Sequence, residues 1–223
     1  STYKEKVYNS IELDLEKRLI KLPKLKWVKI KGYRNKESIN GRIRSAVIRK
    51  DAERYYVSIL VEEDVYKPMF TPQSIIGIDL GIKDLIVTSH NEKIKNIIKD
   101  RSKRLKGLQR ALARCKAGSK NRYKIKLKIQ RLWQKIRNAR KHLIHDITNK
   151  LIKENDIIVC EDLDVKSMYK DHNIAKSLNS NPLGEIIRVL KYKAEWNNKK
   201  LIQIDRYYPS SQECSVCGFQ NKE

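Results

Sequence analysis

The sequence has little cysteine, no long apolar run, and few acidic residues to balance its basic ones. Its 223 residues include only four cysteines, too few for a disulfide framework, so a reducing, cytosolic compartment is expected. No apolar run approaches the roughly 18 residues that a membrane-spanning helix needs. No secretory signal opens the chain. Neither secretion nor membrane insertion is therefore indicated.

The basic residues are concentrated in one part of the chain. Fifty Lys and Arg against 26 Asp and Glu give a net charge of +24, and the hydrophobic fraction of 40% is enough for a packed core. Residues 99–150 carry 19 basic and 2 acidic groups, a net of +17, whereas residues 77–98 and 151–223 are each neutral. This uneven distribution favours a nucleic-acid-binding element. The alternative is a helical hairpin whose charge faces only water.

The N-terminal part has the pattern of antiparallel β-structure. Ile11, Leu13 and Leu15 alternate with polar residues, and residues 42–49 and 54–61 form a predicted hairpin. Several short strands with few helical signals predict a small β-barrel or sandwich. Residues 67–73 contain two prolines and are interpreted as a linker.

The pattern changes after the linker to an α/β order. Short apolar segments predict strands at 75–79, 85–89, 92–98, 156–161 and 201–205. Helices are predicted at 101–116, 121–154 and 182–196, and Gly118 and Ser119 separate the first two as a stop and a cap. This order is compatible with an RNase H-like sheet.

Two carboxylates end apolar strands in the same way. Asp79 follows Ile76-Gly77-Ile78, and Glu161 follows Ile158-Val159-Cys160. Parallel strands can bring such residues into one crevice, where paired carboxylates beside a polyanion suit Mg²⁺. An Asp that merely caps a turn is the alternative for Asp79. Asp162 and Asp164 rank lower because they lie beyond the strand end.

The cysteines and histidines give weaker signals. Cys214 and Cys217 have the spacing of one half of a zinc ribbon, and two free surface thiols are the alternative. A redox role is weaker still, and Cys115 and Cys160 are unsuited as zinc partners because they lie on the basic helix and in a core strand. The two histidines of the long helix, at 142 and 145, are interpreted as phosphate or packing contacts.

Ordered motifs over nearly the whole chain resemble the transposon-encoded OrfB/TnpB family, compact relatives of type V CRISPR effector nucleases. The matches are Leu22-Pro23-Lys24, the segment 27–33, Gly77-Ile78-Asp79-Leu80-Gly81-Ile82-Lys83, the segments 118–122, 159–166, 192–196 and 205–211, and Cys214-Ser215-Val216-Cys217-Gly218.

The resemblance implies a domain plan and an activity. Residues 1–70 would be part of a wedge β-barrel that binds nucleic acid. Residues 75–208 would be a RuvC-type domain of RNase H fold with a basic helical insertion at 99–154, and 209–223 the first half of a zinc ribbon. The resemblance further implies an Mg²⁺-dependent DNA endonuclease, guided by a transposon-derived RNA, in a prokaryotic cytoplasm. Asp79 and Glu161 would be catalytic Mg²⁺ ligands, and Cys214 and Cys217 would bind structural Zn²⁺.

The basic helices would lie along the nucleic acid. The residues expected to bind it are Arg101, Lys103, Arg104, Arg110, Arg114, Lys120, Arg122, Lys124, Lys128, Arg131, Lys135, Arg137, Arg140 and Lys141.

The sequence also departs from the family pattern. An N-terminal helical region, a second cysteine pair and a third catalytic Asp are not found, so the chain is expected to be truncated at both ends and incomplete for cutting. Two other functions stay open: an RNA-guided DNA-binding protein without nuclease activity, and an unguided RuvC-like transposase or resolvase.

Overall fold

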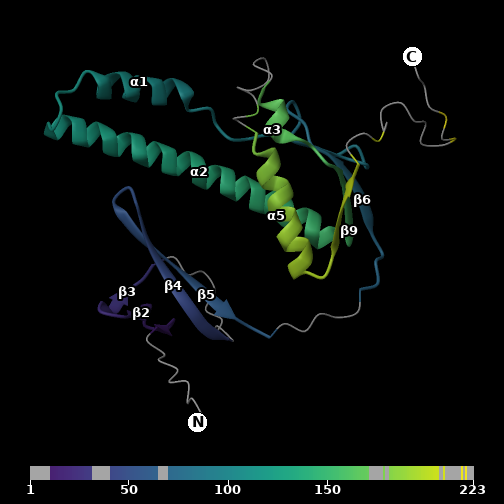
Figure 1. Cartoon of the computed structure of the whole chain (residues 1–223), viewed down its shortest axis with the longest axis horizontal. Helices are drawn as coiled ribbons and strands as arrows, with labels where there is room; N and C mark the ends of the chain where they lie inside the picture. Colours follow the sequence, from purple (N-terminus) through teal and green to yellow (C-terminus); the bar gives the residue numbers. More distant parts are fainter. Residues whose placement is uncertain are drawn as a thin grey trace, which may run out of the picture. The chain divides into compact units, whose positions relative to one another are not determined.

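The computed structural model describes residues 11–31, 41–64, 70–170 and 181–205, together with the single residues 178, 208, 217 and 219. The chain divides into two compact units, residues 1–66 and 67–223, which are described separately below (Figure 1). None of the described helices is both long and apolar enough to cross a membrane. The predicted domain limits at residues 70, 75 and 208 stay predictions.

The first unit contains two antiparallel sheets. Strands β1 (Glu12–Asp14), β2 (Leu19–Leu22) and β3 (Lys26–Lys29) form one of them, in the order β1-β2-β3. Only the middle strand, β2, has fully buried side chains. These are Ile20 and Leu22, which alternate with less buried residues and so point to the same face of the sheet. Strands β4 (Arg42–Asp51) and β5 (Arg54–Glu62) form the other sheet.

The β4–β5 hairpin confirms the predicted pairing and shows a tight turn. Asp51 is opposite Arg54, so Ala52 and Glu53 alone make the connection. Ala52 has a φ of 55°, a left-handed conformation that costs a side-chain-bearing residue free energy. Among the described residues the two sheets remain separate in their hydrogen bonding, so the closed barrel stays a prediction.

The second unit is built on a mixed five-stranded sheet with the order β10-β9-β6-β7-β8. Strands β6 (Ile75–Asp79), β9 (Ile157–Glu161) and β10 (Lys200–Ile204) are parallel. Strands β7 (Ile86–Thr88) and β8 (Lys93–Ile94) continue the sheet antiparallel beyond β6. The predicted α/β unit is therefore confirmed, with strands close to their predicted positions.

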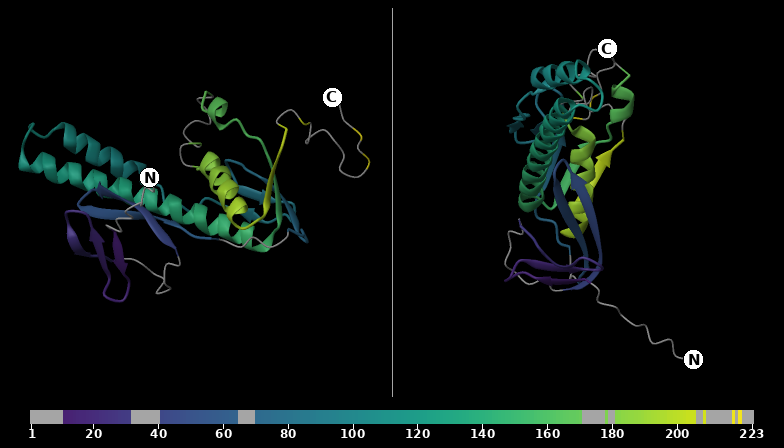
Figure 2. Two further views of the ribbon diagram at one scale, coloured as in Figure 1. Left: turned by 60° about the horizontal axis from the view of Figure 1, so that its bottom comes forward. Right: turned by 90° about the vertical axis from the view of Figure 1, so that its left-hand side faces the viewer.

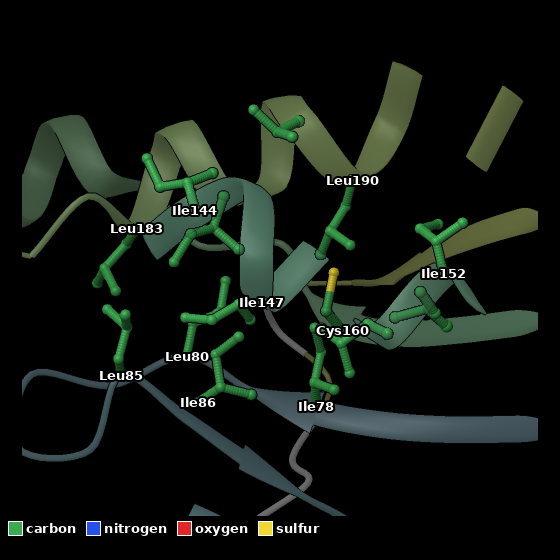
Figure 3. Close-up of a cluster of buried hydrophobic side chains, with 14 of the residues drawn as sticks. Ile78, Leu80, Leu85, Ile86, Ile144, Ile147, Ile152, Cys160, Leu183 and Leu190 are labelled. Atoms are coloured by element: carbon green, nitrogen blue, oxygen red, sulfur yellow. The ribbon is translucent and has the colours of Figure 1, made fainter. Parts of the chain in front are cut away.

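One face of this sheet is covered by helices α2 (Lys120–Glu154) and α5 (Leu183–Trp196). Figure 3 shows Ile144, Ile147 and Leu190 of the helices above Ile78 and Cys160 of the strands. The covered strand positions alternate with exposed or half-buried ones, as in β6, where Ile76 and Ile78 are buried and Ile75 is exposed. Burying these aliphatic side chains supplies the main driving force for this unit.

Only the C-terminal part of α2 belongs to this core. Its remaining length forms a hairpin with α1 (Ser102–Ala113), and the two helices run side by side in all three views (Figures 1 and 2). Gly118 has a φ of 75°, and the Ser119 hydroxyl accepts a hydrogen bond from the Arg122 N–H at 3.1 Å. The predicted cap at Ser119 is thus confirmed, whereas α1 already ends at Ala113, before the predicted stop at Gly118. Apolar residues recur along α2 at steps of three and four, a spacing that predicts a continuous buried stripe including Ala139. Ala139 is exposed, so the stripe is not continuous.

A buried lysine ties α5 to α2. The Lys193 side chain is 8% exposed, and its Nζ donates to the His145 carbonyl, the Thr148 hydroxyl and the Asn149 carboxamide oxygen at 3.2, 2.7 and 2.5 Å. Burial lowers the pKa of the Lys193 ammonium. The three N–H donors of the Lys193 ammonium are therefore all satisfied by neutral oxygen atoms within the interface between α2 and α5.

Asp156 joins the N-terminal ends of the parallel strands. Its Oδ2 accepts hydrogen bonds from the Gln73 N–H, the Ser74 N–H and the Ser74 hydroxyl at 3.0–3.2 Å. Its Oδ1 lies 3.5 Å from the Lys199 ammonium, and its carbonyl accepts from the Lys200 N–H. One residue thus connects the segments that begin β6, β9 and β10.

We predict that Asp156→Asn lowers the urea midpoint of unfolding at pH 7. The hydrogen bond from Gln73, followed by that from the Ser74 hydroxyl, lowers the pKa of Asp156 below its ordinary value of 3.8. Its stabilising contribution is therefore present above that value and is lost as the pH falls through the folded-state pKa. The difference in urea midpoint between the unsubstituted protein and Asp156→Asn should therefore become smaller below pH 4. Glu154→Gln, an exposed neighbour, is the control, and an equal effect of both substitutions would contradict the role of Asp156.

Candidate carboxylate site and nucleic-acid interface

Asp79 and Glu161 lie next to each other on the sheet face that α2 and α5 leave uncovered. Strands β6 and β9 are parallel, with Gly77 opposite Val159 and Ile78 opposite Cys160. Continuing this register by one residue places Asp79 opposite Glu161, on neighbouring strands about 4.8 Å apart. Because Ile78 and Cys160 point into the core, the next residues point to the opposite face. Asp79 is exposed and Glu161 half-buried.

The same row of the sheet extends to both sides of the pair. Val87 of β7 is opposite Asp79, and Ile204 of β10 is opposite Glu161. Lys93 of β8 follows beyond Val87. The row thus presents two adjacent acids between apolar neighbours, with a basic side chain at the β8 edge.

The loop after Asp79 is held in place by tight backbone contacts. The Gly81 N–H donates to the Leu85 carbonyl at 3.4 Å, and a Cβ on Gly81 would lie 2.8 Å from the Asp84 carbonyl oxygen. The Asn181 carboxamide donates to the Ile82 carbonyl at 2.9 Å. The turn therefore explains why glycine is needed at position 81. A close approach of phosphate, expected from the sequence, stays a prediction.

The neighbouring acids take part in local structure. The Asp164 carboxylate accepts from the Ser167 N–H at 3.1 Å and caps the short helix α3 (Val165–Met168). The Asp162 carboxylate accepts from the Gln203 carboxamide at 3.3 Å. Both acids lie beyond the strand end, and these contacts agree with the prediction that they are weaker candidates for metal ligands than Asp79 and Glu161.

The donor set fits a hard divalent cation in part. Carboxylate oxygens are ligands that Mg²⁺ prefers, and Mg²⁺ sites often use one or two carboxylates together with water and substrate phosphates. Among the described residues, no group of three or more His, Cys, Asp and Glu side chains could hold a metal ion. Asp79 and Glu161 are therefore a candidate pair of carboxylate ligands, without a third among the described residues.

The predicted nucleic-acid-binding side chains are mostly exposed along the α1–α2 hairpin. Arg101, Arg122 and Arg140 are half-buried. Those exposed are Lys103, Arg104, Arg110, Arg114, Lys120, Lys124, Lys128, Arg131, Lys135, Arg137 and Lys141. Helix α1 buries no residue fully, and Leu132 is the only fully buried residue in the first half of α2. The hairpin therefore offers an extended basic surface.

Arg122 has a structural role that the sequence did not suggest. Its Nη1 donates to the carbonyls of Leu112 and Cys115 at 3.0 and 3.3 Å. These carbonyls lie at the end of α1, where the last turn lacks intrahelical donors. The guanidinium thus closes the hairpin turn.

The histidines and cysteines occupy different environments. His142 pairs with Asp146 at 2.5 Å, whereas burial and the nearby Lys193 and Lys141 lower the pKa of His145. Burial also raises the pKa of the Cys160 thiol to about 11, consistent with its exclusion as a zinc ligand. Cys217 is exposed, and Cys214 lies outside the described residues.

Comparison with known proteins shows the family. Residues 58–172 match the OrfB_IS605 family, described as "Probable transposase", and residues 184–223 match "Cas12f1-like, TNB domain". The chain belongs to the OrfB_IS605 family, so the resemblance to OrfB/TnpB proteins is confirmed.

Curated relatives carry matching names. The chain is 36% identical to a "Putative RNA-guided DNA endonuclease" of Streptomyces pristinaespiralis, over 77% of this chain and 43% of the relative. It is 34% identical to "Putative RNA-guided DNA endonuclease InsQ" of Escherichia coli strain K12, over 96% of this chain and 56% of the relative. The chain thus spans about half the length of these relatives.

A solved structure shows the likeness in fold. This chain is similar to a chain of the "Cryo-EM structure of the Cas12f1-sgRNA-target DNA complex", with a TM-score of 0.51 and 18% sequence identity. The likeness covers 75% of this chain and 36% of that one. A Cas12-like fold is therefore shown for this chain.

We predict that Arg122→Ala destabilises α1 by about 1 kcal/mol, because two carbonyls at its end lose a charged donor. Lys124→Ala, which removes an exposed basic side chain two residues further on, should change stability by less than about 0.5 kcal/mol. Amide hydrogen exchange within residues 102–113 measures the difference. Equal protection of α1 in both variants would contradict the capping role.

Proposed function

We propose that this chain carries the nuclease centre of an RNA-guided DNA endonuclease associated with a transposon. The observation that carries the proposal is the register that places Asp79 beside Glu161 at the ends of two parallel strands. The order of the mixed sheet supports a RuvC-type domain of RNase H fold. The names of the relatives support the activity.

The proposal divides the work between two parts of the second unit. The α1–α2 hairpin holds guide RNA and target DNA through their phosphates, which its exposed Lys and Arg side chains neutralise. The open face of the sheet presents the carboxylates to the DNA strand. The N-terminal unit would contribute a wedge-like surface for nucleic acid, including the basic strand β3.

Asp79 and Glu161 would hold Mg²⁺. When bound, the metal supplies activation of water and stabilisation of the leaving oxygen. The two side chains orient the site on rigid strands, and a phosphate of the substrate completes the set of oxygen donors. Cys214 and Cys217 would bind Zn²⁺ as one half of a ribbon, a proposal supported by their spacing and by the family match over 184–223.

We predict that Asp79→Asn and Glu161→Gln each reduce target cleavage by about two orders of magnitude or more, because each removes a charge that stabilises the reacting centre. DNA cleavage is measured with the gene product containing this sequence, together with its RNA and Mg²⁺. Binding of the same DNA should persist, because neither acid neutralises a phosphate.

Asp162→Asn is the matched control, because it removes the adjacent carboxylate and should retain cleavage. Unchanged cutting by Asp79→Asn would show that the metal site is wrongly placed. Cutting without RNA would favour the unguided transposase or resolvase. RNA-dependent binding without any cutting by the unsubstituted protein would favour the guided DNA-binding protein.

We also predict that the hairpin sets the salt dependence of nucleic-acid binding. Replacing Lys124, Lys128 and Lys135 together by Gln should reduce the slope of log K against log salt by about 2, since each lost phosphate contact removes about 0.7–0.9. The control removes the same charge at Lys95, Lys153 and Lys191, which are exposed outside the predicted interface. Equal slopes for the two triple variants would contradict a role specific to the hairpin.

A further inference from the structure

A cavity of about 580 Å³ lies between α2, α3 and the first turn of α5. Its polar wall on α2 includes Arg137, Arg140 and Lys141, and its apolar wall includes Ile144 and Val189. The acid in the lining is Glu185, which is engaged by Arg188 through hydrogen bonds of 2.9 and 2.5 Å. The lining therefore includes three basic side chains of α2 besides this paired acid.

The first turn of α5 adds backbone donors to the same cavity. Pro182 precedes the helix, and among the described residues no side chain caps this end. The first N–H groups of an α-helix lack intrahelical partners and form its positive end. Leu183, Gly184 and Glu185 of this turn line the cavity. Cationic side chains and helix N–H groups thus converge on one space, an arrangement that suits a phosphate group.

The cavity lies on the helix-covered side of the sheet, and short chain segments connect its lining to the strand ends that carry the carboxylates. Asn181 lines it and donates to the Ile82 carbonyl at 2.9 Å. Ile82 is three residues after Asp79, so an extended chain separates their Cα atoms by at most about 11 Å. Val165, another lining residue, is four residues after Glu161, a reach of at most about 14 Å. Along a nucleic-acid strand with an axial rise of about 3.4 Å per nucleotide, Cα separations of this size are spanned by roughly three or four nucleotides.

We propose that this cavity binds a backbone phosphate of the nucleic-acid strand that reaches the carboxylate site, and so fixes the position of that strand. The inference rests on the proposed function. It adds a specific phosphate site beside the sheet to the extended hairpin surface. The ligand chemistry is a phosphodiester, which DNA and RNA share.

The sharpest test fills the cavity without changing its charge. A Cβ on Gly184 would have only the Val165 side chain nearby, at 3.9 Å, so the backbone accepts a side chain there. Gly184→Phe should occupy the space that the phosphate needs, whereas Gly184→Ala adds one methyl group. Both remove a helical glycine, so neither is expected to weaken α5 through helix propensity.

Binding is measured by fluorescence anisotropy with labelled 20-nucleotide single strands of DNA and of RNA of equal sequence. Gly184→Phe should weaken binding at least fivefold for one or both strands, and Gly184→Ala should weaken it less. The double variant Arg140→Gln with Lys141→Gln should also weaken binding at least fivefold. It should reduce the slope of log K against log salt by about 1.4. The control pair, Lys153→Gln with Lys191→Gln, should have a smaller effect.

Thermal unfolding shows whether each variant is folded, and Gly184→Leu, which fills the same space with a smaller side chain, decides the question if Gly184→Phe fails to fold. A loss with DNA alone identifies the DNA strand as the source of the phosphate, and a loss with RNA alone identifies the RNA. Wild-type binding of both strands by folded Gly184→Phe would overturn the inference. That result can coexist with Asp79-dependent cleavage, so failure here is distinguishable from failure of the proposed function.

Discussion

Strands β6 and β9 pair in parallel with Ile78 opposite Cys160, and this register carries Asp79 and Glu161 into the same row of the sheet. The core requires it, because a shift of β6 by one residue would turn Ile76 and Ile78 away from the helices that Ile158 and Cys160 of β9 still face. The hydrophobic effect that stabilises the sheet therefore also determines where the two acids meet. Asp156 joins the opposite ends of the same strands through its hydrogen bonds to Gln73, Ser74 and Lys200.

Helix α2 serves two purposes along its length. Its C-terminal part packs on the sheet through Leu143, Ile147 and Leu151 and is joined to α5 by Lys193. Its N-terminal part pairs with α1 and exposes basic side chains. Because the helix is continuous from Lys120 to Glu154, the charged hairpin is rigidly connected to the layer that supports the carboxylates. Of the net charge of +24, residues 99–150 of the hairpin carry +17, residues 1–76 carry +7, and the segments 77–98 and 151–223 are neutral.

Much of the second unit could be predicted from local signals. Short apolar segments that end in an acid identified β6 and β9, and Gly118 and Ser119 identified the hairpin turn. The candidate acids were found for the same reason, because a carboxylate after a buried strand is conspicuous. Strand pairing could not be read from these segments, since register depends on contacts between residues far apart in the sequence.

The missed residues have roles that only tertiary contacts reveal. No sequence pattern marks Lys193, yet the α2–α5 interface encloses it. Arg122 looked like a phosphate contact, whereas its guanidinium donates to the carbonyl of Leu112 in α1 and to that of Cys115 just beyond the helix. Ala139 fitted the apolar spacing of α2 but lies where no helix packs against it closely enough to bury it. Gly184 carried no sequence signal, because its importance comes from the cavity it lines.

The proposed nuclease centre requires Asp79 and Glu161 to act together as one cation site. Paramagnetic broadening of backbone amide signals by Mn²⁺, a probe that accepts the same oxygen ligands as Mg²⁺, tests this directly. Broadening should be strongest at Asp79 and Glu161, weak at Ile75 and Ile157 at the other ends of the same strands, and reduced at both acids by Asp79→Asn. Broadening centred elsewhere in the chain, or unaffected by that substitution, would contradict the account.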